Sequence, residues 1–313
     1  MKPAIRATTF GSLRNNVANF DQSAIASDIP RSRKQWLARG LSNAVIKTLG
    51  LNRPGFWRTE FLQILQPTVT IETAYGPLLC RCNHGRLLWR AQTFHTEEPE
   101  TVQWLDSLSP DDTLWDIGAN VGLYSLYAAK FRGCHVLAVE PESQNYALLV
   151  DNIALNGVGK LCLPACMGIT RQFGLQKLDV LYLTKGGAYN SCAPFSNGQT
   201  GSGKGTIQQL LFGVSLDDLA LKYGLPAPTH LKVDVDGLEP EIIDGAQSVL
   251  SGDRLRSILI EINRSSERDL AIPSNLKKHG FELVSERSNW ESRSNRTREQ
   301  ECPTTNLIFV RKK

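Results

Sequence analysis

The sequence lacks any run of about 20 apolar residues, the length that an α-helix needs to cross a membrane. The N-terminal stretch also lacks the apolar core of a secretory signal, so neither a transmembrane span nor export is expected. Strong net charge is missing as well, because 35 Lys and Arg stand against 31 Asp and Glu and give +4 at pH 7. Bulk charge therefore does not favour a polyanion as the partner.

Cysteine pairs at the spacing of a zinc finger are not evident. The chain has seven scattered cysteines, of which Cys80 and Cys82 form a C-x-C pair in an expected strand. A structural zinc site needs four ligands, so this pair does not predict one. Several of the other cysteines lie in apolar runs, where a free thiol behaves as a small hydrophobic side chain. A reduced, cytoplasmic protein is the expected setting.

Charge and composition divide the chain into three expected regions. Residues 1–66 hold ten Lys or Arg against three Asp or Glu and are expected to be partly disordered, with an amphipathic helix near 35–51. That helix either packs on its own domain or lies on a membrane surface, so peripheral membrane contact stays open. Residues 67–111 are expected to form a small α/β cap, and residues 112–313 the main domain.

The main domain alternates between apolar strands and helical stretches. Its expected strands are 113–117, 135–140, 160–167, 229–236 and 257–262. Its expected helices lie near 122–131, 143–155, 215–223, 239–250 and 267–279. This alternation predicts an α/β fold with a mostly parallel sheet and helices on both faces. Strands at 281–286 and 306–313 have no long helix between them, so they are expected to pair in antiparallel fashion.

Two further segments need an interpretation. In the cap, 68–82 and 86–94 are expected to form short strands around turns, and 98–108 a helix with acids in its first turn. In the main domain, the segment 184–212 begins with a run rich in Gly, Ser and Asn and is too long for an ordinary connection. It is therefore expected to be a functional loop or a disordered one.

The stretch "LWDIGANVGLYSL", residues 114–126, contains a glycine turn between a strand and a helix. Asp116 ends the strand, and Gly118 and Gly122 permit a tight turn that a ligand can approach closely. The helix that follows offers unpaired N–H groups to a carboxylate or phosphate. Glu140 ends the next strand, where an acid can bind both hydroxyls of a ribose. The ligand is therefore expected to be a nucleoside.

The spacing of the turn distinguishes between two nucleoside cofactors. The dinucleotide fingerprint G-x-G-x-x-G needs glycine at two positions where this chain has Asn120 and Leu123. The observed D-x-G-x-N-x-G fits S-adenosyl-L-methionine better, because Asp116 can face its amino group and the amides of the turn its carboxylate. The expected cofactor residues are Asp116, Gly118, Asn120, Gly122 and Glu140.

The stretch "KVDVDGLEPEI", residues 232–242, places three acids at the ligand-facing end of the fourth strand. Buried acids need an ion pair, hydrogen bonds or a metal. Asp234 or Asp236 is the expected catalytic base, because an alcohol is a poor nucleophile while it is protonated. Together with Glu239 they could instead hold a divalent cation such as Mg²⁺. Asp236 and Glu239 could also simply cap the next helix.

The acceptor site is expected to include the long loop, with Tyr189, Asn190 and Ser191 as its binding residues. Two histidines could compete for the role of base on chemical grounds. His230 and His279 are nevertheless expected to be structural, since one enters a strand at the edge away from the ligand and the other ends a helix.

Three stretches in order, "LWDIGANVGLYSLYAA", "VEPESQNYALLVDNIALN" and "LKVDVDGLEPEIIDGA", resemble the FkbM-type S-adenosylmethionine-dependent methyltransferases. The resemblance covers about residues 95–263. It implies a class I methyltransferase (Rossmann-like) fold and O-methylation of a hydroxyl on a sugar, glycolipid or polyketide-like acceptor. It also implies that the five cofactor residues named above bind S-adenosylmethionine, with Asp234 beside the reacting centre.

Two other functions stay open from the sequence. A nucleic-acid methyltransferase would use the basic residues 1–66 and the Arg-rich segment 293–298. A nucleic acid is nevertheless not expected to be the partner. An inactive binding module with a methyltransferase fold would be expected to have lost the glycine turn or the acids, and this chain has both. The oligomeric state cannot be read from the sequence.

Overall fold

The computed structural model describes residues 41, 44, 47–48, 67–180, 186–187, 191–194, 207–288 and 304–312. In the N-terminal region, the four described positions are helical and lie within the helix expected over 35–51. Within the described part of the chain, no helix is long and apolar enough to cross a membrane.

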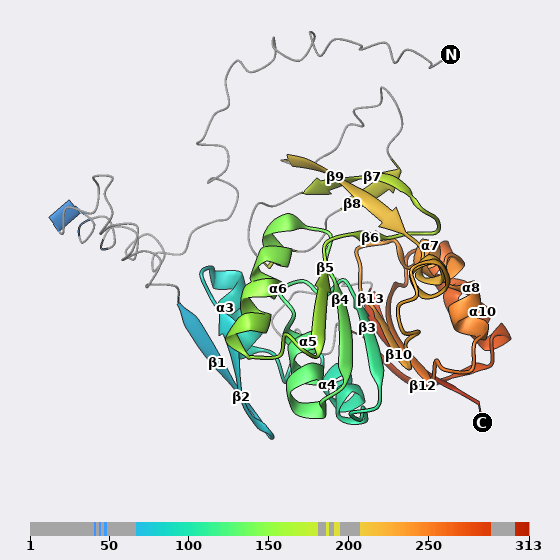
Figure 1. Cartoon of the computed structure of the whole chain (residues 1–313), viewed down its shortest axis with the longest axis horizontal. Helices are drawn as coiled ribbons and strands as arrows, with labels where there is room; N and C mark the ends of the chain where they lie inside the picture. Colours follow the sequence, from blue (N-terminus) through green and yellow to red (C-terminus); the bar gives the residue numbers. More distant parts are fainter. Residues whose placement is uncertain are drawn as a thin grey trace, which may run out of the picture. The chain divides into compact units, whose positions relative to one another are not determined.

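A seven-stranded sheet forms the centre of the main domain (Figure 1). Its strands, in spatial order, are β12 (Phe281–Ser288), β13 (Thr304–Arg311), β11 (Ser257–Asn263), β10 (His230–Val233), β3 (Thr113–Ile117), β4 (His135–Val139) and β5 (Cys162–Ala165). The pairs from β11 to β5 are all parallel. The last two strands are antiparallel to each other, and β13 is antiparallel to β11, as expected. The chain leaves β3 toward β4 on one side and returns at β10 on the other, which makes the ends of β3 and β10 the place where a ligand crevice opens.

Helices cover both faces of this sheet (Figure 1). On one face lie α4 (Pro99–Asp106), α5 (Leu123–Tyr127), the π-helical turn η2 (Ala128–Arg132) and α6 (Ser143–Leu155). On the other face lie η3 (Asp218–Lys222), α7 (Glu239–Asp244), α8 (Gln247–Ser251), α9 (Glu267–Leu270) and α10 (Ile272–Lys278). Alternate residues of β3 serve the two cores, with Leu114 packed in one and Trp115 and Ile117 in the other. The predicted class I methyltransferase architecture is therefore confirmed.

The cap begins with a hairpin and continues into a helix. Strands β1 (Thr68–Thr73) and β2 (Gly76–Arg81) pair antiparallel, and α3 (Gly85–Gln92) follows. The strand expected over 86–94 was therefore wrong. Leu87 and Ala91, four residues apart, bury the same face of α3, and the His84 side chain accepts a hydrogen bond from the backbone N–H of Arg86 at its start. The side chains of Asn152 in α6 and of Asn156 just after it accept hydrogen bonds from the backbone of β2 and so fix the cap to the main domain.

A second sheet occupies part of the segment that was expected to be a loop. Its strands, in spatial order, are β6 (Gly168–Ile169), β9 (Ile207–Val214), β7 (Gly174–Val180) and β8 (Ser191–Pro194). The loop expected over 184–212 was therefore too long, because β8 and the first part of β9 lie inside it. The run "QQLLFG" in β9 does not alternate cleanly between apolar and polar residues, and this hid the strand.

The histidines have structural roles. His230 lies at the start of β10, and its ring nitrogens contact Ser257 Oγ at 2.7 Å and Asp112 Oδ2 at 3.3 Å. Trp104 Nε1 donates to the same Ser257 oxygen at 2.8 Å, so this buried network joins α4 to the sheet. His279 ends α10, and its ring contacts a backbone carbonyl of that helix. Both histidines are consistent with the roles expected from the sequence.

Candidate functional site

The glycine turn brings β3 and β10 into close approach. Gly118 has φ +86°, and a Cβ built there would lie 1.9 Å from the carbonyl oxygen of Asp234. Gly122 has φ +89°, and its Cβ would lie 2.4 Å from the Leu149 side chain of α6. Asn120 is also left-handed, at φ +52°, a conformation that asparagine tolerates better than most side chains. The two glycines are therefore required by the packing of the turn.

Glu140 fastens this turn from the end of β4. Its two carboxylate oxygens accept hydrogen bonds from the backbone N–H groups of Asn120 at 2.8 Å and Glu142 at 2.9 Å. Burial raises the pKa of Glu140 to about 7, against the lowering effect of these hydrogen bonds. The carboxyl group is thus held in a fixed orientation and can lose its proton when a hydroxylated ligand binds.

A pocket of about 830 Å³, measured out to its open mouth, lies beside this turn. We call it the cofactor pocket. The residues that line it are Arg90, Ile117, Gly118, Asn120, Val139, Glu140, Pro141, Asn145, Met167, Gly168, Ile169, Leu178, Gly187, Asp234, Val235, Asp236 and Leu238. Three of the five expected cofactor residues are among them, namely Gly118, Asn120 and Glu140. Both polar and apolar residues line the pocket, as a nucleoside ligand requires.

Asp116 and Gly122 do not line this pocket. Asp116 is 1% exposed and lies beneath the turn, where it accepts a 2.5 Å hydrogen bond from Ser125 Oγ. Its other oxygen lies 3.8 Å from the ammonium of Lys232. Direct contact with the amino group of the cofactor, expected from the sequence, is therefore not supported by this placement. Asp116 instead supports the turn from below.

Lys232 is the site residue that sequence reasoning missed. It is 1% exposed on β10, and its Nζ lies 2.7 Å from Asp234 Oδ2 and 5.3 Å from the centre of the Tyr124 ring. Burial lowers the pKa of Lys232, but Asp234, Asp116 and Glu98 outweigh it and raise the pKa above its usual value. The ammonium therefore stays charged. A lysine inside the otherwise apolar strand, two residues before an acid on the same face, was the available signal.

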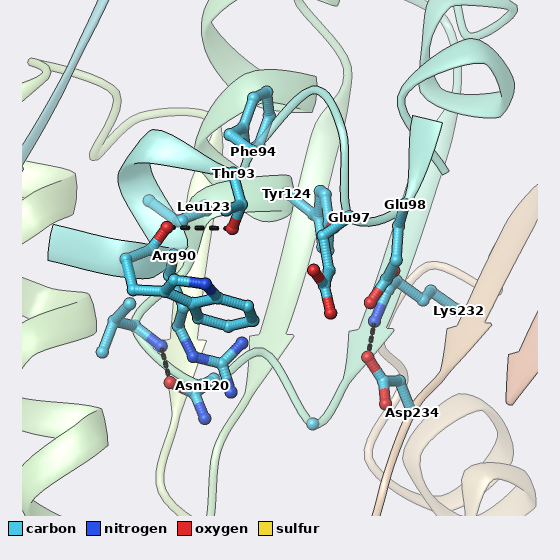
Figure 2. A pocket seen from close by; sticks show the side chains of 13 residues that line it. Arg90, Thr93, Phe94, Glu97, Glu98, Asn120, Leu123, Tyr124, Lys232 and Asp234 are labelled. Atoms are coloured by element: carbon cyan, nitrogen blue, oxygen red, sulfur yellow. Dashed lines mark hydrogen bonds and ion pairs between the residues drawn. The ribbon is translucent and has the colours of Figure 1, made fainter. Parts of the chain in front are cut away.

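A second pocket, which we call the acceptor pocket, also borders the turn (Figure 2). Its lining residues are Trp89, Arg90, Thr93, Phe94, Glu97, Glu98, Gly118, Asn120, Val121, Leu123, Tyr124, Lys232 and Asp234. Aromatic rings and carboxylates therefore face the same space. The residues shared with the cofactor pocket are Arg90, Gly118, Asn120 and Asp234. The two pockets meet at these residues, so a donor in one can reach an acceptor in the other.

The three acids after β10 do not form a metal site. Asp234 lines both pockets and is paired with Lys232, while Asp236 lines the cofactor pocket. Glu239 is 2% exposed, lines neither pocket, and accepts a hydrogen bond from the backbone N–H of Val235 at 3.2 Å. Among the described residues, no group of three or more His, Cys, Asp or Glu is arranged to hold a metal ion. The sequence-based hypothesis of a Mg²⁺ site is therefore not supported. Asp234 is paired with Lys232, and Glu239 accepts a hydrogen bond from the backbone of its own loop.

The long loop reaches the site at two described glycines. The carbonyl oxygen of Gly187 accepts from Asn120 Nδ2 at 2.9 Å, and the backbone N–H of Gly186 donates to Asn145 Oδ1 at 2.7 Å. Arg90 Nε donates to the Gly186 carbonyl oxygen at 3.3 Å. The loop thus borders the cofactor pocket. Of the expected acceptor residues, Tyr189 and Asn190 lie outside the described residues, and Ser191 is described for its backbone alone, as the first residue of β8.

The sequence matches the domain family described as "Methyltransferase FkbM domain" over residues 116–283. The hexuronic acid methyltransferase AglP of Haloferax volcanii is 25% identical over 176 residues, which cover 56% of this chain and 66% of that protein. The methyltransferase sdnD of Sordaria araneosa is 26% identical over 198 residues, which cover 56% of this chain and 75% of that protein. Among solved structures, a methyltransferase FkbM from Methylobacillus flagellatus has a TM-score of 0.43 and 16% identity, and the match covers 71% of this chain and 53% of that one.

Proposed function

Because this chain belongs to the FkbM methyltransferase family and is an S-adenosylmethionine-dependent methyltransferase, we propose that it methylates a hydroxyl of a sugar-like acceptor. One observation carries the proposal. The acceptor pocket combines Trp89 and Tyr124 with carboxylates, and it joins the cofactor pocket at Asp234. Flat apolar rings and a few fixed polar groups are what binds a small hydroxylated molecule. A glycolipid or a polyketide-like hydroxyl is the alternative within this class.

Each part of the site has a proposed task toward the cofactor. Gly118 and Asn120 present the turn to its amino acid end, and Glu140 binds its ribose hydroxyls. S-adenosylmethionine, when bound, supplies an electrophilic methyl group. The protein must then align the acceptor oxygen with that group, and such positioning can lower a barrier by ~7 to 11 kcal/mol.

The acceptor hydroxyl must also lose its proton. Asp234 borders both pockets, and Lys232 fixes the orientation of its carboxylate, so Asp234 is well placed to contact that hydroxyl. Asp236 borders only the cofactor pocket and is therefore the weaker candidate for contact with the acceptor hydroxyl. The similarity to AglP supports a sugar as the acceptor class, since that protein is named a hexuronic acid methyltransferase.

The test is a transfer reaction with deuterated methyl S-adenosylmethionine. Purified protein is incubated with a panel of methyl hexopyranosides and, separately, with cell extract, and products are searched by mass spectrometry for the labelled methyl group. We expect a labelled ether on a hydroxylated sugar-like compound. Label on nitrogen or carbon atoms, or no transfer to any hydroxyl, would contradict the proposal.

A nucleic-acid acceptor is the competing function. The basic residues that favoured it, in 1–66 and 293–298, lie almost entirely outside the described residues. In the acceptor pocket the acids Glu97, Glu98 and Asp234 outnumber the cations Arg90 and Lys232, which does not suit a phosphate backbone. A mobility shift with RNA or DNA that weakens steeply as salt rises would support this function instead.

A further inference from the structure

Glu98 is a second carboxylate of the acceptor pocket, and the sequence gave no reason to single it out. It directly precedes α4, and its Oε2 accepts a hydrogen bond from Thr101 Oγ1 at 3.0 Å. Burial raises the pKa of Tyr124, and the charge of the neighbouring Glu98 carboxyl group raises it further. Figure 2 shows the Glu98 carboxylate pointing toward the Lys232 ammonium on the wall of the pocket. The hydrogen bond from Thr101 therefore orients the Glu98 carboxyl group at the wall of the pocket.

Asp234 and Glu98 differ in how their charge is balanced. Lys232 Nζ is 2.7 Å from Asp234 and 3.8 Å from Asp116, so a single ammonium already faces two carboxylates. The Asp234 carboxylate is therefore held in place by its ion pair with Lys232 and is suited to orienting a hydroxyl.

The surroundings of Glu98 favour proton uptake. Burial raises the pKa of Glu98, Asp234 raises it further, and Lys232 and the Thr101 hydrogen bond lower it. The titratable groups that act on Glu98 are Asp234 and Lys232 of β10, Tyr124 of α5, Glu261 of β11 and Glu100 of α4. Of these groups, only Lys232 is positively charged, and its ammonium also faces Asp234 and Asp116. A base with a raised pKa is the more effective one near neutral pH.

We propose that Glu98 is the catalytic base of the transfer, and that Lys232 and Asp234 form a fixed pair that positions the acceptor hydroxyl. This inference rests on the proposed function. The O–H bond of the acceptor breaks, and its proton moves to the Glu98 carboxylate. The acceptor oxygen forms the new bond to the methyl carbon with an electron pair of its own. The pair of the broken carbon–sulfur bond stays on sulfur, which becomes a neutral thioether. Deprotonated Glu98 returns when the proton leaves to solvent.

The first test needs no acceptor. Full-length protein is labelled with ¹³C at its glutamate carboxyl groups, and the Glu98 resonance is identified by its loss in Glu98→Gln. We expect Glu98 to titrate well above the ordinary glutamate pKa of about 4.3. Titration at or below that value would overturn the proposal, whether or not any sugar is methylated.

The second test separates the two acids kinetically, with the methyl hexopyranosides of the transfer assay as acceptors. Glu98→Gln should lower kcat by at least ~10²-fold and leave the calorimetric affinity for S-adenosylmethionine within about twofold. It should also abolish the fall of kcat on the acid side of the pH profile, whereas Glu98→Asp should retain a shifted fall. Asp234→Asn should raise the acceptor KM more than it lowers kcat.

The matched control is Glu72→Gln, an exposed glutamate on β1 of the same cap, which should behave as the wild type. Thermal melting of each variant shows whether it is folded. Near-normal kcat in folded Glu98→Gln would overturn the proposal. If the wild type methylates no hexopyranoside, the proposed acceptor class fails, and the titration alone then decides the role of Glu98.

Discussion

The cofactor pocket and the acceptor pocket are neighbours that share four residues, but the acceptor pocket takes more of its lining from the cap. The turn at Gly118 and the end of β4 at Glu140 form the core of the first and lie within the family match. Trp89 and Glu98, on α3 and before α4, are in the second and precede that match. The shape of the cofactor pocket therefore depends mainly on the backbone of the glycine turn. The shape of the acceptor pocket depends more on side chains of the cap that pack against the main domain. The first can be shared across a family, and the second can differ from member to member.

The change Gly118→Ala is expected to disrupt the turn on which the cofactor pocket is built and which the acceptor pocket also borders. The new Cβ would lie 1.9 Å from a carbonyl oxygen of β10, and φ of +86° is strained for alanine. We expect cofactor affinity to fall more than ~100-fold, about 2.7 kcal/mol, with a lower melting temperature. Gly85→Ala, where a Cβ meets nothing within 4 Å, is the control. Normal binding by Gly118→Ala would show that the turn does not contact the cofactor.

Lys232→Met tests the pair that joins the two pockets. Its removal leaves Asp116, and in part Asp234, without their cation, so we expect about 3 to 5 kcal/mol of lost stability in chemical denaturation. The double variant Lys232→Met/Asp234→Asn should recover part of that loss. Equal losses in the single and double variants would show that the ion pair is not what makes Lys232 important.

Glu140→Ala should weaken S-adenosylmethionine binding by roughly 1.5 to 3 kcal/mol, the cost of a lost charge-assisted hydrogen bond. The wild type should also bind more weakly at pH 6 than at pH 8. With a pKa of about 7, free Glu140 is largely protonated at pH 6, and a ligand that needs the carboxylate must displace that proton. The loss should approach about tenfold per pH unit below 7 and disappear in Glu140→Ala. Calorimetry at several pH values measures both effects, and a pH-independent affinity would exclude this role.

Trp89→Ala should act on the acceptor side. The Trp89 side chain is 44% exposed. It lines the acceptor pocket and does not line the cofactor pocket. We expect the acceptor KM to rise about tenfold, in keeping with ~1 to 2 kcal/mol for a lost aromatic contact, and the cofactor affinity to stay unchanged. Steady-state kinetics at saturating S-adenosylmethionine gives the first value. A change in cofactor affinity would show that the two pockets are not separable.

The smallest expected effect is that of a chelator. Lys232 already neutralises Asp234, and Glu239 is bonded to its own loop, so EDTA should leave methyl transfer unchanged. Loss of activity that Mg²⁺ restores would contradict this arrangement.

What the sequence could predict follows the same division. The strand ends at Asp116, Glu140 and Asp234 follow from local patterns, and the parallel sheet follows from their alternation with helices. Lys232 was not predicted as a site residue, because the role of a buried lysine depends on the acids around it. One of these acids, Asp116, is far from Lys232 in the sequence. Glu98 was missed for the same reason, since it becomes a site residue only when α4 packs beside β10.

Other errors came from segments whose environment is set by tertiary contacts. The stretch 86–94 contains apolar residues that suit a strand or a helix, and its contacts with the main domain selected the helix. The sheet of β7, β8 and β9 was hidden because its exposed face carries Leu210 and Phe212, which the sequence alone does not distinguish from core residues.

The central claim is that Glu140 binds the cofactor, whereas Trp89 binds only the acceptor. Calorimetry of S-adenosylmethionine and NAD with the wild type, Glu140→Ala and Trp89→Ala tests this claim most directly. The account predicts that the wild type binds S-adenosylmethionine in the low micromolar range (about −8 kcal/mol) or more tightly and does not bind NAD. It also predicts weaker binding by Glu140→Ala and unchanged binding by Trp89→Ala. Binding of NAD in place of S-adenosylmethionine, or full affinity in Glu140→Ala, would contradict it.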